Sequence, residues 1–164
     1  LMGCMLSAAS CNRWWMEDIL GTQDYAKEQD AVGALGENRV FFLPYLMGER
    51  SPHNDPDARG TFIGMTMDTT RADMTQAVLE GVAFALRDSF EVAKSLGLKI
   101  EKTRICGGGA KSALWRTIMA AERLVKAAGT EEPDAELTQK YEARYQQFRQ
   151  IYPACRELFG RLIF

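Results

Sequence analysis

The chain has 164 residues, of which 46% are hydrophobic and 26% charged, and its net charge at pH 7 is −2. This length fits about one globular domain with a buried core, and the lack of a basic block argues against nucleic acid as a main partner. The longest apolar runs, such as residues 40–43, are far too short to span a bilayer, and no secretory signal opens the chain. We therefore expect a cytoplasmic protein that does not bind membranes.

The cysteines and the first residue add two expectations. The four cysteines, Cys4, Cys11, Cys106 and Cys155, show no CxxC spacing and no matching histidine cluster. This pattern argues against a zinc site and predicts reduced, buried cysteines. Because the chain begins at Leu1 rather than Met, we expect part of a longer protein, with some functional machinery outside it.

The first part of the chain predicts two helices and a strand. The first helix starts near Ser7 or Ser10 and runs to about residue 20, with its tryptophan pair in the core. A more polar helix follows over residues 24–35. Residues 39–43 (RVFFL) form the clearest early strand, because they are rich in β-branched and aromatic side chains.

Residues 48–60 (GERSPHNDPDARG) form a long polar loop, and such loops are more often functional than not. His53 is the only histidine, and a positioning or solvated role is favoured over a general base because no partner is identified. Asp55, Asp57 and Arg59 lie close together in this loop. They form either a charged rim for a polar substrate, magnesium or another lobe, or an Arg–Asp pair that holds the loop.

The longest predicted helix covers residues 71–96, after a short strand at 61–65. Thr69 or Thr70 is its expected N-cap, with Asp73 in the first turn, where the helix dipole favours an anion. One face of the helix carries small residues at steps of four, so we expect another element to approach its backbone closely: Ala77, Gly81, Ala85 and Ser89.

The second half predicts a strand, a glycine turn and two helices. The strand covers residues 103–106, a helix follows over 111–128, and a last helix runs from Pro133 until Pro153 breaks or bends it. Its aromatic stripe of Tyr141, Tyr145 and Phe148 fits a buried face. Strands that alternate with helices predict an α/β fold.

The glycine turn is the strongest candidate for a binding site. Gly107, Gly108 and Gly109 lie between the predicted strand and helix, followed by Ala110 and Lys111. Backbone N–H groups at such a turn can receive a phosphate or the sugar and ring of a nucleotide. A packing role is equally open because glycine also permits close approach, and the turn fits neither common phosphate-loop pattern.

Several motifs together resemble the FGGY carbohydrate kinases. Residues 60–65 (GTFIGM) and 73–80 (DMTQAVLE), seven residues apart, resemble the second signature pattern of that family. Residues 5–11, 42–50 and 52–60 are similar to its xylulose kinase branch, whereas glycerol kinases carry Tyr-Trp where this chain has His53 and Asn54. The turn at 107–112, followed by Trp115, is similar to the adenosine-binding turn of the family.

The resemblance implies the ATP-binding C-terminal lobe of a ribonuclease-H-like, actin-like kinase, with magnesium handling the phosphate charge. Residues 107–111 would lie against adenine and ribose, and the 48–60 loop would supply substrate-loop candidates His53, Asp55 and Arg59. The resemblance places the catalytic aspartate, the terminal phosphate loop and the sugar-binding N-terminal lobe outside this chain. It also implies a further strand and helix that are missing near residues 120–122.

We therefore expect a lobe that takes part in ATP-dependent phosphorylation of a pentulose, D-xylulose to xylulose 5-phosphate. A kinase for gluconate, ribulose or glycerol and a non-catalytic actin-like module remain open, as does a homodimer. The fragment alone should be catalytically inactive, and Gly109→Val should abolish nucleotide binding by the intact protein without harming the fold.

Overall fold

The computed structural model describes residues 3–100, 103–122 and 134–162 of the chain. Within these ranges, no helix is long and apolar enough to cross a membrane. Most of the described elements are helices, and the two strands form one short antiparallel sheet.

The N-terminal part is helical, but its boundaries differ from the prediction. Helix α1 (Ala9–Arg13) continues into a π-helical turn, η1 (Trp14–Ile19), and the cap position Ala8 has no side-chain hydrogen bond, so neither serine caps it. Helix α2 (Tyr25–Asp30) is shorter than predicted, although the Asp24 carboxylate accepts a hydrogen bond from Lys27 N at 3.1 Å.

Helix α3 (Arg71–Ser95) agrees closely with the prediction. Thr70 and Asp73 form a reciprocal capping box, which satisfies backbone donors that the first turn leaves free. The close approach expected at the small-residue face occurs at Gly81, where an added Cβ would lie 2.1 Å from Phe42 O. Glycine is required here because the backbone of a strand touches the helix.

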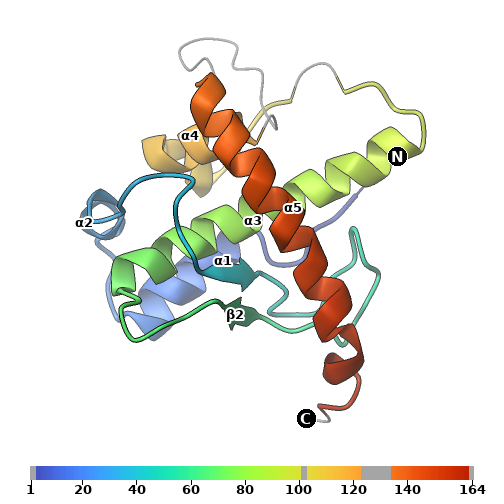
Figure 1. Cartoon of the computed structure of the whole chain (residues 1–164), viewed down its shortest axis with the longest axis horizontal. Coiled ribbons are helices and arrows are strands. Elements are labelled where there is room, and N and C mark those ends of the chain that lie inside the picture. Colours follow the sequence, from blue (N-terminus) through green and yellow to red (C-terminus); the bar gives the residue numbers. More distant parts are fainter. Residues whose placement is uncertain (1–2, 101–102, 123–133, 163–164) are drawn as a thin grey trace.

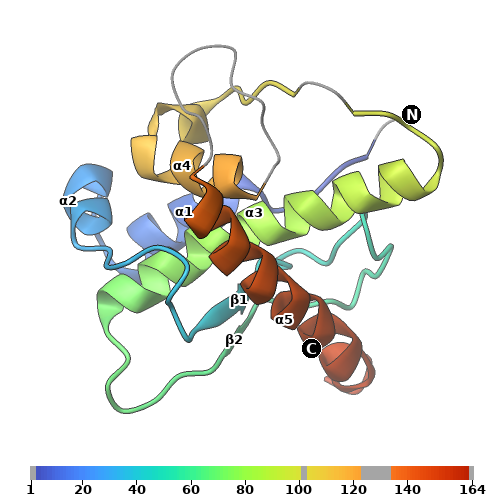
Figure 2. The ribbon, with the colours of Figure 1, turned by 45° about the horizontal axis from the view of Figure 1, so that its top comes forward.

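That strand belongs to the sheet of β1 (Phe41–Leu43) and β2 (Thr61–Ile63). The two strands are antiparallel, and Phe42 pairs with Phe62 in the central register position. Figure 2 shows β1 lying along α3 and β2 on its outer side. Both strands fall within predicted ones but are shorter.

Two further helices complete the described structure. Helix α4 (Ala113–Ala121) is capped by Ser112, and α5 (Ala135–Phe159) is capped by Asp134. Helix α5 continues through Pro153, so the proline does not break it. The predicted stretch 123–128 and the predicted start at Pro133 lie outside the described residues.

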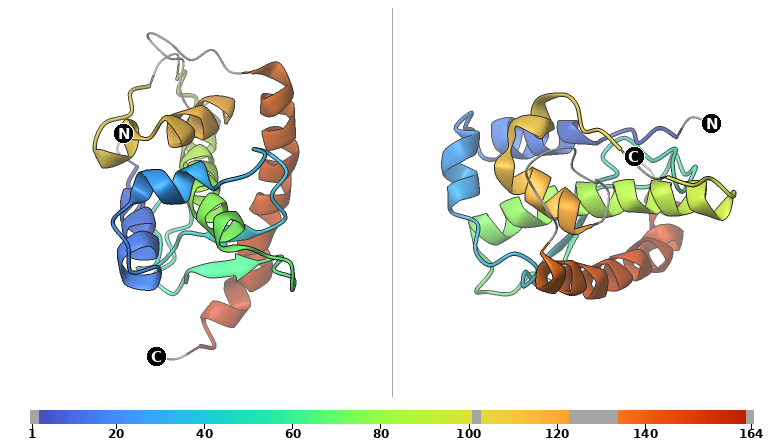
Figure 3. Two further views of the ribbon diagram at one scale, coloured as in Figure 1. Left: turned by 90° about the vertical axis from the view of Figure 1, so that its left-hand side faces the viewer. Right: turned by 90° about the horizontal axis from the view of Figure 1, so that it is seen from above.

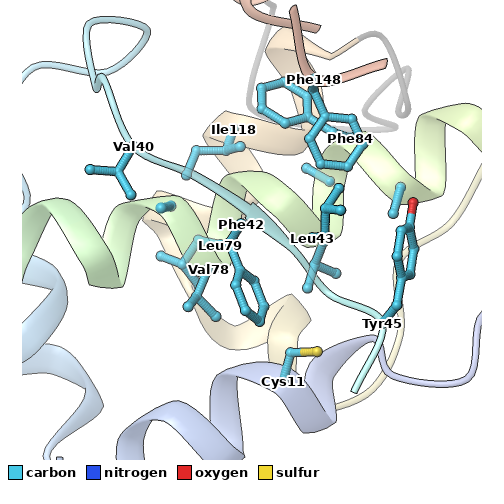
Figure 4. Close-up of a cluster of buried hydrophobic side chains, with 14 of the residues drawn as sticks. Cys11, Val40, Phe42, Leu43, Tyr45, Val78, Leu79, Phe84, Ile118 and Phe148 are labelled. Carbon is cyan, nitrogen blue, oxygen red and sulfur yellow. The ribbon is translucent and has the colours of Figure 1, made fainter. Parts of the chain in front are cut away.

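Helix α3 is the central element of the molecule. Figure 1 shows α5 crossing it, and both views of Figure 3 place α1 on one side of α3 and α5 on the other. The core forms along this axis. In Figure 4, Phe42 and Leu43 lie beside α3, with Cys11 of α1 below them and the neighbouring rings of Phe84 and Phe148 above.

Buried polar groups also join the helices. The Glu80 carboxylate of α3 accepts hydrogen bonds from Arg144 at 2.6 Å and from Tyr141 at 2.9 Å, both on α5. Arg87 bridges the carboxylates of Glu122 and Glu142. Because all these groups are at least partly removed from water, breaking one pair leaves a charged or polar group in the interior without its partner. The predicted burial of the α5 aromatic stripe is confirmed.

Two further predictions were wrong. Residues 103–106 are not a strand: within the described part of the chain the sheet contains only β1 and β2, and an isolated extended segment gains no ladder hydrogen bonds. Of the four cysteines only Cys11 is buried, while Cys106 is exposed and the other two are intermediate; all four are free thiols. The Cys11 thiol is held by the carbonyls of Ser7 and Pro44.

Candidate functional site

The glycine turn connects the coil after α3 to helix α4. Gly107 has a φ of 90°, a left-handed conformation that favours glycine, and it precedes the 3-10 turn η2 (Gly108–Lys111). Ser112 then caps α4, because its Oγ accepts a hydrogen bond from Trp115 N at 3.0 Å. The glycines thus reverse the chain just before a helix start, as the sequence predicted.

A pocket of about 590 Å³ opens beside this turn. Its volume lies within the range usual for sites that bind small molecules. Its walls come from α1, α2, the turn and the start of α4, and the lining residues include Ala9, Asn12, Arg13, Gln29, Gly108 and Lys111. We call it the glycine-turn pocket.

A hydrogen bond connects two walls of the glycine-turn pocket. The Ser112 hydroxyl donates to Gln29 Oε1 at 2.6 Å while it caps α4. This bond uses the amide oxygen of Gln29, so its NH2 group is the part of the amide that can donate a hydrogen bond to another group. Sequence reasoning did not find Gln29, because it lies 83 residues from Ser112 on a separate helix.

The three glycines have different structural roles. Gly108 lines the pocket, and an added Cβ there would meet no atom within 4 Å. An added Cβ at Gly109 would lie 2.7 Å from Cζ3 of Trp115. Trp115 is buried and donates to Leu79 O at 2.9 Å, so it cannot move cheaply. This contact argues against the expectation that Gly109→Val spares the fold.

The electrostatics of the glycine-turn pocket favour an anion. Among the residues that the structure describes, Arg13 and Lys111 are the charged members of the lining, and no carboxylate belongs to it. Arg13 also pairs with Glu17 at 3.2 Å on the exposed surface, where such a pair contributes little stability. Nor do the described residues contain a cluster of three or more histidine, cysteine or acidic side chains able to hold a metal ion.

Asn12 is a feature of the glycine-turn pocket that the sequence did not reveal. It is 6% exposed, and no group in the described ranges donates to its Oδ1. A buried amide oxygen without a partner costs free energy, so its retention beside a pocket is consistent with a role in ligand binding.

The other predicted site residues lie in the loop of residues 48–60, which we call the proline loop. His53 stacks on Tyr152 of α5, with ring centroids 3.5 Å apart, and its Nε2 lies 2.9 Å from Tyr45 Oη. Burial lowers the pKa of His53 to about 4, so the ring is neutral at pH 7. The predicted positioning role of His53 fits these contacts, although the ring is half-buried rather than freely exposed.

Asp55 and Arg59 also form contacts that shape the proline loop. Asp55 accepts hydrogen bonds from Tyr152 Oη at 2.7 Å and from Asp57 N at 2.9 Å. Hydrogen bonds from Tyr152 and from backbone N–H groups outweigh the opposing effect of burial and lower the pKa of Asp55. Arg59 donates to the carbonyls of Pro56 and Ala58, both at 2.9 Å.

The structure does not bring the proline loop and the glycine turn together. No residue of the loop lines the glycine-turn pocket; the loop lies against the C-terminal half of α5 instead (Figure 1). The two predicted sites are therefore separate regions of this chain.

Comparison with known proteins identifies the family. Residues 3–134 match the model of the FGGY family of carbohydrate kinases, C-terminal domain. The chain is 42% identical over 122 residues to xylulose kinase of Escherichia coli K12, a match that covers 73% of this chain and 25% of that protein. It is 26% identical to xylulose kinase of Bacillus subtilis over 196 aligned positions, which cover 96% of this chain and 39% of the relative.

Solved structures agree with this result. A xyloylose kinase from Brucella ovis superposes with a TM-score of 0.85 at 33% identity, covering 96% of this chain and 40% of that one. Glycerol kinase from Plasmodium falciparum, solved with ADP, gives a TM-score of 0.59 at 25% identity, covering 68% of this chain and 23% of that one. These similarities confirm the predicted α/β, ribonuclease-H-like or actin-like fold class, here as a partial domain.

The chain spans about a quarter of the length of the Escherichia coli relative that it matches. The family match covers most of this chain and corresponds to one domain of the family. The chain therefore belongs to the FGGY family of carbohydrate kinases and matches their C-terminal domain.

Proposed function

We propose that this chain is the ATP-side lobe of a xylulose kinase, which transfers the γ-phosphate of ATP to a hydroxyl of D-xylulose. The observation that carries the proposal is the glycine-turn pocket, whose described lining combines a glycine wall with the cations Arg13 and Lys111 and contains no acid. The high identity to a xylulose kinase supports the choice of sugar. The cytoplasm is the proposed location of this enzyme.

The nucleotide would lie with its adenosine against Gly108. A side chain at this position would occupy the space that a ring needs, and the structure leaves that space empty. Ala110 and Lys111 would follow along the same wall, while Gly107 supplies the left-handed turn and Gly109 packs against Trp115. Arg13 and Lys111 would attract the phosphates electrostatically.

Magnesium would come with the nucleotide, since ATP-dependent kinases use it to neutralise phosphate charge. The described residues offer no ligand set for it, because the pocket lining contains no carboxylate. We propose that the nucleotide phosphates and residues outside this chain hold the ion.

The remaining catalytic parts would lie elsewhere in a longer protein. We propose that an N-terminal lobe supplies the sugar site, the catalytic aspartate and the terminal phosphate loop, since this chain covers only 25% of its Escherichia coli relative. The Bacillus subtilis alignment supports a segment that is missing from this chain, which we propose to lie near residues 120–122. Its 196 positions cover 96% of a 164-residue chain, so about 39 positions have no counterpart here. A homodimer stays a prediction.

Nucleotide titration of the chain tests the proposal. Isothermal titration calorimetry with ATP, ADP and adenosine should show weak binding of all three, with the phosphates adding affinity that decreases as salt is raised. A coupled assay for ADP release with D-xylulose should show no turnover. Turnover by this chain alone would refute the proposal that the catalytic residues lie outside it. A lack of adenosine binding at millimolar concentration would refute the proposal that the glycine-turn pocket binds the nucleotide.

The same titration separates the alternatives. A kinase for gluconate, ribulose or glycerol would bind ATP equally well, and only a sugar panel with the longer protein would distinguish it. A non-catalytic actin-like module whose turn serves assembly would bind no nucleotide here.

A further inference from the structure

We propose that Tyr152 is a positioning residue that fixes the conformation of the proline loop through two separate contacts made by one side chain. Tyr152 lies on α5, 97 positions after Asp55 and 99 after His53 in sequence. None of the sequence patterns in the loop or the helix indicates this pairing.

The first contact uses the face of the ring. The Tyr152 and His53 rings are nearly parallel, with an interplanar angle of 10° and a centroid distance of 3.5 Å. Tyr45 completes a small aromatic cage, because its ring meets both others edge-on at 87° and its hydroxyl lies within hydrogen-bond distance of His53 Nε2. The stacking holds the plane of the His53 ring parallel to Tyr152, and the contact with Tyr45 places Nε2 on the Tyr45 side.

The second contact uses the hydroxyl group. Tyr152 Oη donates to Asp55 Oδ2 at 2.7 Å, while Asp55 Oδ1 accepts the backbone N–H of Asp57. The carboxylate therefore connects the tip of the loop to α5. A hydrogen bond to a charged acceptor is stronger than one between neutral groups, so this bond is well suited to hold a loop in place.

The loop is rigid enough for these contacts to determine its position. Glu49 and Asp55 exchange two backbone hydrogen bonds, at 2.8 and 2.7 Å, which close the loop on itself. Gly48 approaches the carbonyl of Pro56 so closely that an added Cβ would lie 2.7 Å from it. Hydrogen bonds of Ser51 with Cys4 and Ser89 hold the start of the loop to the N-terminal segment and to α3. Tyr152 supplies the contacts that hold His53 and Asp55, further along the loop, against α5.

The positioning decides which side chains the loop presents. His53 and Asp55 face inward to Tyr152, whereas Arg50, Asn54 and Asp57 are exposed. Only the consequence for a sugar substrate rests on the proposed function: if the loop lies on the sugar side, these outward residues meet the substrate or the other lobe. The positioning itself can be tested without any substrate.

The test is NMR spectroscopy of the 164-residue chain, in which His53 is the only histidine and its ring signals are unambiguous. In the wild-type chain, His53 should titrate with a pKa of about 4, because burial disfavours the charged ring. The groups that face this ring are Tyr45, Tyr152, Asp55 and Arg156. Tyr152→Leu removes the stacked ring, so the His53 pKa should rise toward 6.5 and its ring-current shift should disappear.

Tyr152→Phe keeps the ring and removes only the hydroxyl. The His53 ring shift should therefore persist, while the amide signals of Asp55 and Asp57 move and exchange faster with solvent. Tyr145→Phe is the matched control: Tyr145 lies on the same helix and its hydroxyl also donates to a carboxylate, Asp88, so its loss should leave the loop signals unchanged.

The outcomes distinguish positioning from general stability. If Tyr152→Leu does not fold, Tyr152→Phe still tests whether Tyr152 positions the loop, through the amide signals of Asp55 and Asp57. The proposal is overturned if Tyr152→Phe leaves these amides unchanged, or if Tyr145→Phe changes them equally. Neither result depends on nucleotide binding, so failure here is separate from failure of the proposed function.

Discussion

Gly108→Val should weaken ATP binding, whereas Gly109→Val should destabilise the fold, although the two glycines are adjacent. At Gly108, which lines the glycine-turn pocket, an added Cβ meets no atom within 4 Å. We expect Gly108→Val to reduce ATP affinity at least tenfold, about 1.4 kcal/mol, because the valine methyl groups occupy the space proposed for the adenosine. Its free energy of unfolding should stay close to that of the wild-type chain.

Gly109→Val should instead destabilise the fold. Its Cβ would lie 2.7 and 2.9 Å from two ring atoms of Trp115, which is 2% exposed. Overpacking of this kind costs about 1–3 kcal/mol. For a chain of this size, each kcal/mol lowers the melting temperature by about 2–4 °C, so we expect a decrease of about 2–12 °C.

The assays are thermal unfolding and calorimetric titration with ATP, run on both variants. Gly33→Val is the matched control, since an added Cβ at Gly33 also meets no atom within 4 Å and Gly33 does not line the pocket. Wild-type ATP affinity in Gly108→Val would show that the turn does not face the nucleotide. Wild-type stability in Gly109→Val would show that Trp115 does not limit this position.

Three further substitutions test the interior. Asn12→Leu should stabilise the chain by about 1–3 kcal/mol in urea unfolding, since it removes a buried oxygen without a partner. The same substitution should weaken ATP binding. A loss of stability would contradict the view that this oxygen costs free energy. Arg144→Met should cost about 3–5 kcal/mol because it leaves the Glu80 carboxylate buried without its cation, and a cost below 1 kcal/mol would count against a charged Glu80. Burial raises the pKa of Glu122 to about 8 despite the attraction of Arg87. The folded state therefore binds more protons than the unfolded state between about pH 4.5 and pH 8, so stability should decrease as pH rises through this window. Glu122→Gln should flatten the profile, and an unchanged slope would exclude Glu122 as its cause.

Local sequence patterns predicted the elements whose contacts are close in sequence. The start of α3 follows from Thr70 and Asp73, which satisfy each other's backbone groups three residues apart. The small-residue face of the same helix predicted a close neighbour, and β1 is that neighbour at Gly81. The glycine turn was likewise recognised from a few adjacent residues, and it does form one wall of a pocket.

Other features depend on segments that are far apart in the chain. Residues 103–106 have the composition of a strand, but a strand needs a partner, and the described sheet provides none for them. Sequence reasoning could not assign different roles to Gly108 and Gly109, because only the position of Trp115 distinguishes them. It also missed Gln29, which reaches the turn from another helix.

The family, the central helix and the position of the glycine turn could be predicted from the amino-acid sequence, because each depends on residue types at short, fixed spacings. The contacts of His53 and Asp55 with Tyr152 became apparent only in the folded chain. The difference lies in the range of the interactions, since caps and periodicity act within one or two turns of a helix. The stacked rings and the carboxylate bond of the proline loop join residues almost a hundred positions apart, which the fold alone brings into contact.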